Sequence, residues 1–265
     1  MYAIGHLSFL HIAFNLYGDA LFHQKTQHFP GQSGFIDIAS NQNISYNIII
    51  TGSVGVGKST VSQLLYEILK DIFDNVQIYP EYIKHEFNNV PLGNLMLDTR
   101  INNVISAETF QHFVLDIWDN QLKQKQFKKG NSINILERLP EDAVSCFTKE
   151  AYDDGEISEL AWNNINQKLI NINEKYNVPK NSDCEFKLVD NNNELSTTIQ
   201  TIINTIIDDV KNGIKNRVFG LIINKDEYCK RIVRRGRQSE INNDTSIYDR
   251  YNDYYSNLYD CLSLK

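Results

Sequence analysis

A glycine-rich segment with the residue types of a phosphate-binding loop has the sequence GSVGVGKST. It fits the pattern G-x-x-x-x-G-K-[ST], in which glycines let backbone N–H groups close around a phosphate. In that pattern the lysine reaches the β- and γ-phosphates, and the serine holds Mg²⁺. The alternative is a glycine turn with a stray lysine. The candidate phosphate-binding residues are Gly52, Ser53, Val54, Gly55, Val56, Gly57, Lys58, Ser59 and Thr60.

The residues around this loop predict the strand and the helix that phosphate binding needs. Residues 46–51 (YNIIIT) form an apolar, β-branched run that is typical of a strand. Apolar residues then recur at helical spacing at positions 61, 64, 65, 68, 69 and 72. The N-terminus of such a helix adds its dipole to the loop and so favours a bound anion.

Two further apolar runs end in charged residues. The run 76–79 is followed by Pro80 and Glu81, and the run 132–136 by Glu137 and Arg138. In an open parallel sheet, ligands bind at the carboxyl ends of the strands, where the loop would hold a nucleotide. There Glu81 could accept a proton from a substrate hydroxyl, Glu137 could pair with Mg²⁺, and Arg138 could stabilise transferring phosphoryl oxygens. The alternatives are a solvated turn glutamate and a surface ion pair.

A fourth strand candidate, residues 217–224, leads into a cluster of four arginines between positions 231 and 237. In a chain of net charge −7, this local reversal of sign favours a phosphate clamp that closes over bound nucleotide. Gly236 would give such a lid its hinge. The alternative is a basic patch for nucleic acid or anionic lipid, but the interleaved aromatics of a nucleic-acid site are missing.

The length, composition and charge of the whole chain limit which folds and functions are possible. Its 265 residues and 42% hydrophobic content suit one α/β domain with insertions or extensions. The net charge argues against a general nucleic-acid-binding surface. Four scattered cysteines without a C-x-x-C pair favour reduced thiols in an intracellular protein. The six histidines form no H-x-x-x-H pair, so we expect no metal site built from side-chain nitrogens.

Two segments lie outside the predicted core. Residues 1–45 contain no 18-residue apolar run, so we expect no membrane span and interpret them as an N-terminal extension of unknown role. The domain that carries the phosphate-binding loop would then be 46–265. Residues 163–216 are Asn-rich around a predicted helix at 195–210, and we interpret them as a surface insertion. No fifth strand is obvious, and 186–190 (FKLVD) and 34–38 are the candidates.

Five motifs taken in order resemble the deoxynucleoside kinases, including the herpesviral-type thymidine kinases. They are GSVGVGKST, the Pro80-Glu81 and Glu137-Arg138 strand ends, Phe110-Gln111 between them, and RIVRRGRQSE at 231–240. The resemblance implies an α/β P-loop kinase fold with a parallel sheet flanked by helices and an arginine-rich lid. It implies transfer of the γ-phosphoryl group of ATP, with Mg²⁺, to the 5′-hydroxyl of a deoxynucleoside. It also implies a cytoplasmic homodimer, in a host cell if viral, without nucleic-acid or membrane partners.

The resemblance also implies a role for each matching residue. Glu81 resembles the general base that takes the proton from the 5′-hydroxyl, and Arg138 the arginine that holds Glu81 or the 5′-end of the substrate. Glu137 resembles the carboxylate linked to Mg²⁺, with Ser59. The lid arginines that contact phosphate would be Arg231, Arg235 and Arg237. The substrate-binding positions would be Gln111 at a pyrimidine edge, Phe147 against the base, Glu240 at the 3′-hydroxyl, and Trp118 and Ala143 near the base.

Two positions indicate which base the substrate of this chain carries. Trp118 and Ala143 stand where cytidine-directed members carry an arginine and an aspartate, so the polar pair that reads the cytosine amino group is absent. The small Ala143 leaves room for the thymine methyl, which favours thymidine and pyrimidine salvage. Trp118 fits a core aromatic equally well. Arg100 replaces a tyrosine that helps with the 3′-hydroxyl in many members, and Leu139-Pro140 replaces the usual serine or histidine after the arginine.

Two rival functions stay open at this stage. A thymidylate kinase shares the loop and the lid, and it would need a further arginine for the substrate phosphate, for which Arg100 is the candidate. A non-catalytic nucleotide-binding protein on a decayed kinase is the second rival. The intact Lys58, Ser59, Glu81 and Arg138 argue against it.

Overall fold

The computed structural model describes residues 45–71, 73–81, 85–87, 90–91, 105–124, 127, 132–192, 194–235 and 246–264. The predicted N-terminal extension, up to residue 44, and the strand candidate 34–38 lie outside these ranges. The elements are, in chain order, β1 (Ser45–Thr51), α3 (Lys58–Leu69), β2 (Val76–Tyr79), β3 (Glu86–Phe87), β4 (Val90–Pro91), α5 (Ala107–Gln124), β5 (Ser132–Glu137), α6 (Pro140–Asp142), the π-helical turn η2 (Ala143–Thr148), α7 (Lys149–Asp153), α8 (Glu159–Tyr176), η3 (Asn181–Asp183), β6 (Glu185–Asp190), α9 (Leu195–Lys211), β7 (Asn216–Ile222), α10 (Lys225–Arg235) and α12 (Ser246–Ser263).

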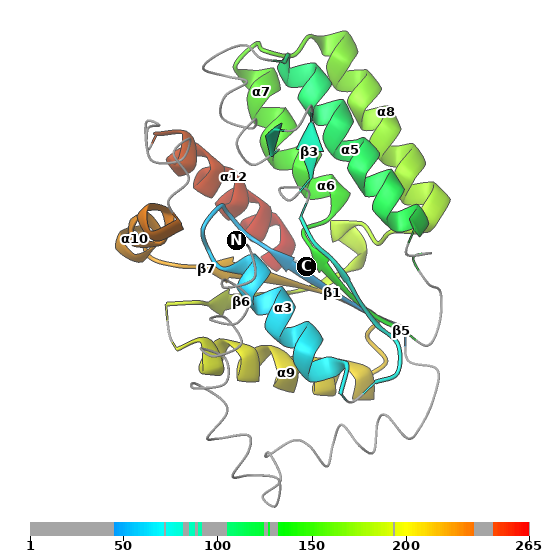
Figure 1. The fold of residues 1–265 in the computed structure, drawn as a ribbon, viewed down its shortest axis with the longest axis vertical. Coiled ribbons are helices and arrows are strands. Elements are labelled where there is room, and N and C mark those ends of the chain that lie inside the picture. The colour runs from blue at the N-terminus through cyan, green and yellow to red at the C-terminus, as the bar shows by residue number, and fades with distance from the viewer. Residues whose placement is uncertain are drawn as a thin grey trace, which may run out of the picture. The chain divides into compact units, whose positions relative to one another are not determined.

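A five-stranded parallel sheet in the order β2-β5-β1-β7-β6 forms the centre of the fold (Figure 1). The four strands predicted from apolar runs are confirmed. Every residue of β5 is buried, as expected of a central strand in a parallel sheet that is covered on both faces. The register pairs Ile50 with Glu137 and Tyr79 with Leu136, so β1, β2 and β5 end at one edge of the sheet.

The fifth strand is β6, which the candidate 186–190 supplies at the edge beside β7. The interpretation of residues 163–216 as a surface insertion is therefore wrong, because this stretch holds the sheet strand β6, most of α8 and all of α9. The helix predicted at 195–210 is confirmed as α9, which is amphipathic and packs by a buried isoleucine face. That face consists of Ile199, Ile202, Ile206 and Ile207.

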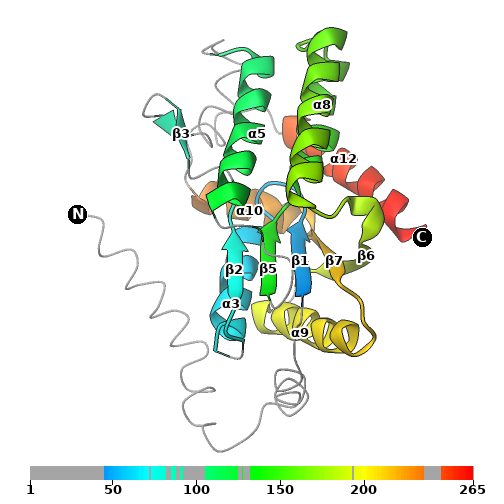
Figure 2. The same cartoon turned by 90° about the vertical axis from the view of Figure 1, so that its right-hand side faces the viewer.

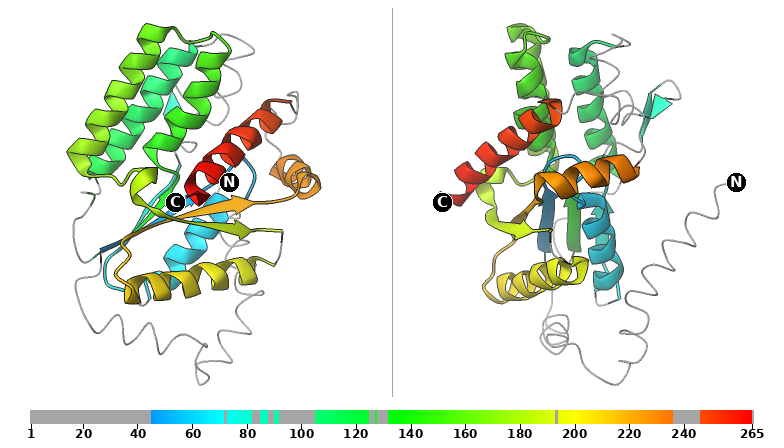
Figure 3. Two further views of the ribbon diagram at one scale, coloured as in Figure 1. Left: turned by 180° about the vertical axis from the view of Figure 1, so that it is seen from behind. Right: turned by 90° about the vertical axis from the view of Figure 1, so that its left-hand side faces the viewer.

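Helices cover both faces of the sheet and its carboxyl edge. The α3 and α9 helices lie on one face and α12 lies on the other (Figure 1). The α5 and α8 helices stand side by side beyond the ends of β2, β5 and β1 (Figure 2). The α10 helix passes over the N-terminal end of α3 (Figure 3). In the part of the chain that the structure describes, no helix is long and apolar enough to cross a membrane.

A buried polar cluster ties β1, α9 and β7 together. The Asp209 carboxylate accepts hydrogen bonds from the Tyr46 hydroxyl and from the Arg217 guanidinium, whose Nε lies 2.8 Å from Oδ2. Tyr46 and Asp209 are both fully enclosed. Because buried charges are tolerated only when they are paired, this cluster fixes α9 and the two strands relative to one another.

We expect Asp209→Ala to lower the free energy of unfolding by about 3–5 kcal/mol, because it leaves the Arg217 charge unpaired in a partly buried site. Asp208→Ala is the matched control, since Asp208 is the adjacent aspartate and is exposed, and it should change stability by less than about 0.5 kcal/mol. Urea denaturation of both variants measures the difference. Equal effects would show that the cluster does not stabilise the fold.

Candidate active site

The loop between β1 and α3 has the backbone geometry of a phosphate-binding loop. Gly52, Gly55 and Gly57 adopt φ angles of 142°, 84° and 99°, which residues with a side chain rarely adopt. At Gly52, a Cβ atom would also lie 2.8 Å from the Leu221 carbonyl oxygen of β7. Lys58 opens α3 and donates from Nζ to the Ser53 carbonyl, 2.8 Å away. The loop therefore brings a cation and a helix N-terminus to one place.

The Ser53 side chain tests whether this loop suits a phosphate. Its hydroxyl is buried and has no hydrogen-bond partner within the described residues. A buried polar group without a partner is uncommon and calls for an explanation. A phosphate oxygen in the loop would accept that hydrogen bond, so the loop fits the phosphates of a nucleotide.

Glu137 joins the loop helix to the ends of two strands. The Ser59 hydroxyl donates to Glu137 Oε1 at 2.5 Å, and the Glu81 backbone N–H faces Glu137 Oε2 at 3.4 Å. The serine and carboxylate oxygens are the hard donors that Mg²⁺ prefers, with phosphates and waters completing its shell. No group of three or more His, Cys, Asp or Glu side chains suited to a metal occurs among the described residues. The donor set thus fits a magnesium ion shared with phosphates.

Glu81 and Arg138 form a buried ion pair where β2 and β5 end. Arg138 also donates from a guanidinium nitrogen to the Gly52 carbonyl, 2.9 Å away, and from its backbone N–H to the Ile50 carbonyl, 3.0 Å away. Its φ of 70° is unusual for a residue with a side chain, and such conformations concentrate at functional sites. The arginine therefore connects the carboxylate directly to the first glycine of the loop.

Two aromatic rings enclose the Arg138 guanidinium. Its central carbon lies 5.0 Å from the centroid of the Phe147 ring and 5.5 Å from that of Tyr255, and the two rings meet edge to face. Both distances suit cation–π attraction. Burial raises the pKa of Tyr255 well above its usual value and that of the neighbouring Cys146 to about 12, so both groups stay protonated. Sequence analysis missed Tyr255, because one tyrosine in the Tyr-rich α12 carries no motif.

Four of the predicted substrate residues lie on elements beyond the carboxyl edge of the sheet. Gln111 and Trp118 lie on α5, while Ala143 and Phe147 lie on η2, which packs against α5. All four side chains are buried. Trp118, Ala143 and Phe147 belong to one hydrophobic core cluster, as the core alternative for Trp118 anticipated.

Of the three predicted lid arginines, Arg231 is the one whose side chain the structure describes. It pairs with Glu227 within α10, and one guanidinium nitrogen donates to the Val56 carbonyl of the loop at 3.2 Å. The predicted lid therefore begins in contact with the phosphate loop. Arg235 ends α10, but its side chain lies outside the described part of the chain. The same holds for the predicted site residues Arg237 and Glu240, the hinge Gly236, and Arg100.

Comparison with known families decides the class of this site. The sequence model of the deoxynucleoside kinase family matches residues 48–184, just over half of the chain. The chain belongs to the deoxynucleoside kinase family. The matched residues contain the loop, Glu81, Gln111 and the Glu137-Arg138 strand end of this family member. Family membership makes it a kinase and supports phosphorylation of a nucleoside.

Solved structures of a deoxyadenosine kinase resemble the fold of this chain. The deoxyadenosine kinase from M. mycoides with bound dATP is 19% identical, with a TM-score of 0.50 over 81% of this chain and 84% of that chain. The same enzyme with bound dCTP is 18% identical, with a TM-score of 0.52 over 83% and 86%. The structure described as EHV4-TK complexed with Thy and ADP is 11% identical, with a TM-score of 0.46 over 80% and 58%. No curated protein matches the sequence. At these identities the two deoxyadenosine kinase structures show the fold alone, which is the α/β P-loop kinase fold.

Proposed function

We propose that this kinase transfers the γ-phosphoryl group of ATP to the 5′-hydroxyl of a deoxynucleoside, with thymidine as its preferred substrate. The observation that carries the proposal is the Glu81–Arg138 ion pair at the mouth of the loop. Glu137 and Ser59 lie beside it, so a base, an anion-stabilising cation and a magnesium-binding pair meet at one edge of the sheet.

Each of these side chains has a defined task in phosphoryl transfer. Bound MgATP supplies the phosphoryl group and part of the positive charge that stabilises its transfer. Glu81 accepts the proton of the attacking 5′-hydroxyl, and Arg138 holds that carboxylate in place. Ser59 and Glu137 hold Mg²⁺, while Lys58 balances charge on the phosphates. The lid arginines close over the nucleotide and exclude water, which limits hydrolysis of ATP.

The preference for thymidine rests on the side chains of α5 and η2. Gln111 offers an amide donor and an acceptor side by side, which suits the edge of a pyrimidine. Ala143 is small and buried on η2, and it stands where a larger polar residue accompanies recognition of cytosine in related kinases. We therefore expect the methyl group of thymidine to occupy the space beside Ala143.

The direct test of the proposed activity uses the loop lysine. Lys58→Ala should abolish turnover of deoxynucleosides, because the β- and γ-phosphates lose their cation, while the circular dichroism spectrum stays that of the folded protein. Lys70→Ala, which removes an exposed lysine just beyond the same helix, is the control and should keep wild-type activity. The assay compares thymidine, the three other deoxynucleosides and thymidine monophosphate. Turnover of Lys58→Ala within a few-fold of wild type contradicts the assignment, and preference for the monophosphate favours a thymidylate kinase.

Replacing Glu81 by Gln should lower kcat by about 100-fold or more, because the amide keeps the shape but cannot take up the proton. The KM for ATP should barely change. Glu86→Gln, at an exposed position on β3, is the matched control. Steady-state kinetics with saturating nucleoside measure both parameters. A normal kcat with weakened ATP binding would assign Glu81 to the metal instead of the proton.

Enlarging Ala143 tests the preference for thymidine. Ala143→Leu should lower kcat/KM for thymidine about 10- to 200-fold relative to deoxycytidine, because only thymidine places a methyl group in that space. The ratio of the two substrates is the measured quantity, since it does not depend on the fraction of folded protein. Val144→Leu adds bulk at the next buried position and should leave the ratio unchanged. An equal loss of kcat/KM for both pyrimidine nucleosides, or a preference of the wild-type enzyme for purine nucleosides, refutes the preference for thymidine.

A further inference from the structure

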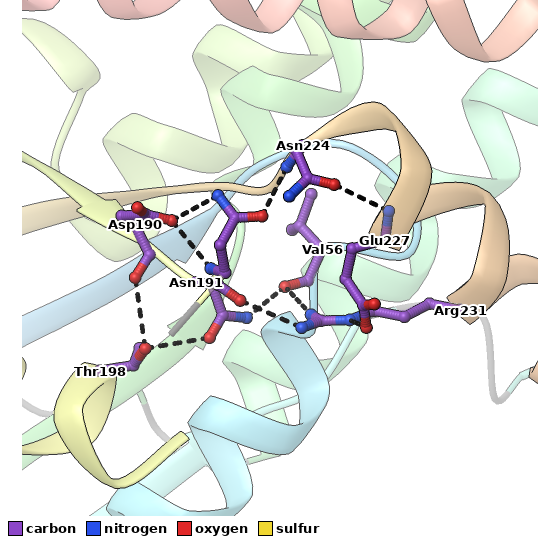
Figure 4. A network of polar contacts seen from close by, with 8 residues as sticks. Val56, Asp190, Asn191, Thr198, Asn224, Glu227 and Arg231 are labelled. Atoms are coloured by element: carbon purple, nitrogen blue, oxygen red, sulfur yellow. Dashed lines mark hydrogen bonds and ion pairs between the residues drawn. The ribbon is translucent and has the colours of Figure 1, made fainter. Parts of the chain in front are cut away.

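The residue that follows β6 contacts the phosphate loop from the side opposite to Arg138. Asn191 is 3% exposed, and its backbone N–H continues the sheet by donating to the Ile222 carbonyl of β7 at 2.8 Å. Its side-chain Nδ2 donates to the Val56 carbonyl of the loop at 2.6 Å (Figure 4). A side chain that is 135 positions away in sequence thus holds the loop just before its last glycine.

The orientation of this amide is fixed. The Val56 carbonyl can only accept a hydrogen bond, so the amide nitrogen must face the loop. The Thr198 hydroxyl, near the start of α9, lies 3.4 Å from the Asp190 carbonyl and 3.1 Å from Asn191 Oδ1, and it donates to the nearer amide oxygen (Figure 4). The contact is also close, because a Cβ atom added at Gly57 would lie 2.8 Å from Asn191 Nδ2. The amide therefore packs directly against the loop glycine whose φ is 99°.

Arg231 shares the same acceptor. The Val56 carbonyl receives a second hydrogen bond from Arg231 at 3.2 Å, and the arginine also donates to the Asn191 carbonyl at 3.0 Å and to Glu227 at 2.9 Å (Figure 4). A lid arginine that moves to a phosphate oxygen gives up the loop carbonyl. Asn191 keeps the buried Val56 carbonyl hydrogen-bonded when Arg231 leaves. The movement of Arg231 therefore does not incur the free-energy penalty of a buried carbonyl without a hydrogen bond.

We propose that Asn191 is a positioning residue of the kinase. It holds the phosphate loop at Val56, oriented by Thr198, and it allows Arg231 to exchange its loop contact for nucleotide phosphate. The tether between Asn191 and the loop does not depend on the function of the protein. The exchange of Arg231 from the loop to a nucleotide phosphate rests on the proposed function.

Three variants separate the donor from the shape of the side chain. Asn191→Ala removes the amide, Asn191→Asp keeps the shape without the donor, and Thr198→Val removes the hydroxyl that orients the amide. Gln200→Ala is the control, because it deletes an exposed side-chain hydrogen bond on the same helix α9, away from the loop.

Hydrogen exchange of the loop amides, measured without nucleotide, tests the tether. Residues 52–60 should exchange about 5-fold faster or more in Asn191→Ala and Asn191→Asp, and about 3-fold faster in Thr198→Val, with no change in the control. The double variant Asn191→Ala/Thr198→Val should match Asn191→Ala, because Thr198 acts through the amide. Unchanged exchange in Asn191→Ala, or wild-type exchange in Asn191→Asp, overturns the tether whatever the enzyme's activity.

Steady-state kinetics test the positioning role. The KM for ATP should rise about 10-fold in Asn191→Ala and at least as much in Asn191→Asp, while the KM for the nucleoside stays that of wild type. A merely structural role would lower the apparent kcat through the amount of folded enzyme and would leave both KM values at those of wild type. Faster exchange without a change in the KM for ATP overturns the positioning role. A wild-type protein that neither binds nor turns over ATP refutes the proposed function, and the exchange data then still decide the tether.

Discussion

The buried ion pair between Glu81 and Arg138 is the contact on which the geometry of this site depends. Its two side chains come from the ends of β2 and β5, and the arginine reaches further to the Gly52 carbonyl that opens the phosphate loop. Because neither charge is exposed to solvent, separating them would leave an unpaired charge in the interior. The parallel register of β1, β2 and β5 must therefore be kept for the site to exist, and the hydrophobic core that fixes this register also fixes the chemistry.

The phosphate loop is held at both of its ends by side chains from distant parts of the chain. Arg138 binds the carbonyl of Gly52 at the start, and Asn191 binds the carbonyl of Val56 near the end. These contacts come from opposite sides of β1, because β5 and β7 are its two neighbours in the sheet and Asn191 continues β6 beyond β7. The residue after the edge strand thus contacts the loop, so the Asn-rich segment 163–216 contributes to the proposed site as well as to the sheet.

Local features of the sequence predicted the parts of this structure that depend on a few consecutive residues. The strand, glycine loop and helix around Lys58 are such a unit, and so are the apolar runs that became β2, β5 and β7. The strand β6 was ambiguous because it is an edge strand of mixed composition, with Val189 as its one fully buried hydrophobic residue. Asn191 and Tyr255 could not be recognised, because their roles depend on partners more than one hundred residues away.

We propose that this edge of the sheet transfers a phosphoryl group to a deoxynucleoside and does not simply bind or hydrolyse nucleotide. The most direct measurement incubates the purified protein with Mg²⁺, thymidine and ATP labelled with ¹⁸O in the γ-phosphoryl group, and quantifies the products by mass spectrometry. We expect thymidine 5′-monophosphate that carries the labelled phosphoryl group, formed in equal amount with ADP. ADP formed together with free labelled phosphate, or no labelled monophosphate from thymidine or any other deoxynucleoside, would contradict it.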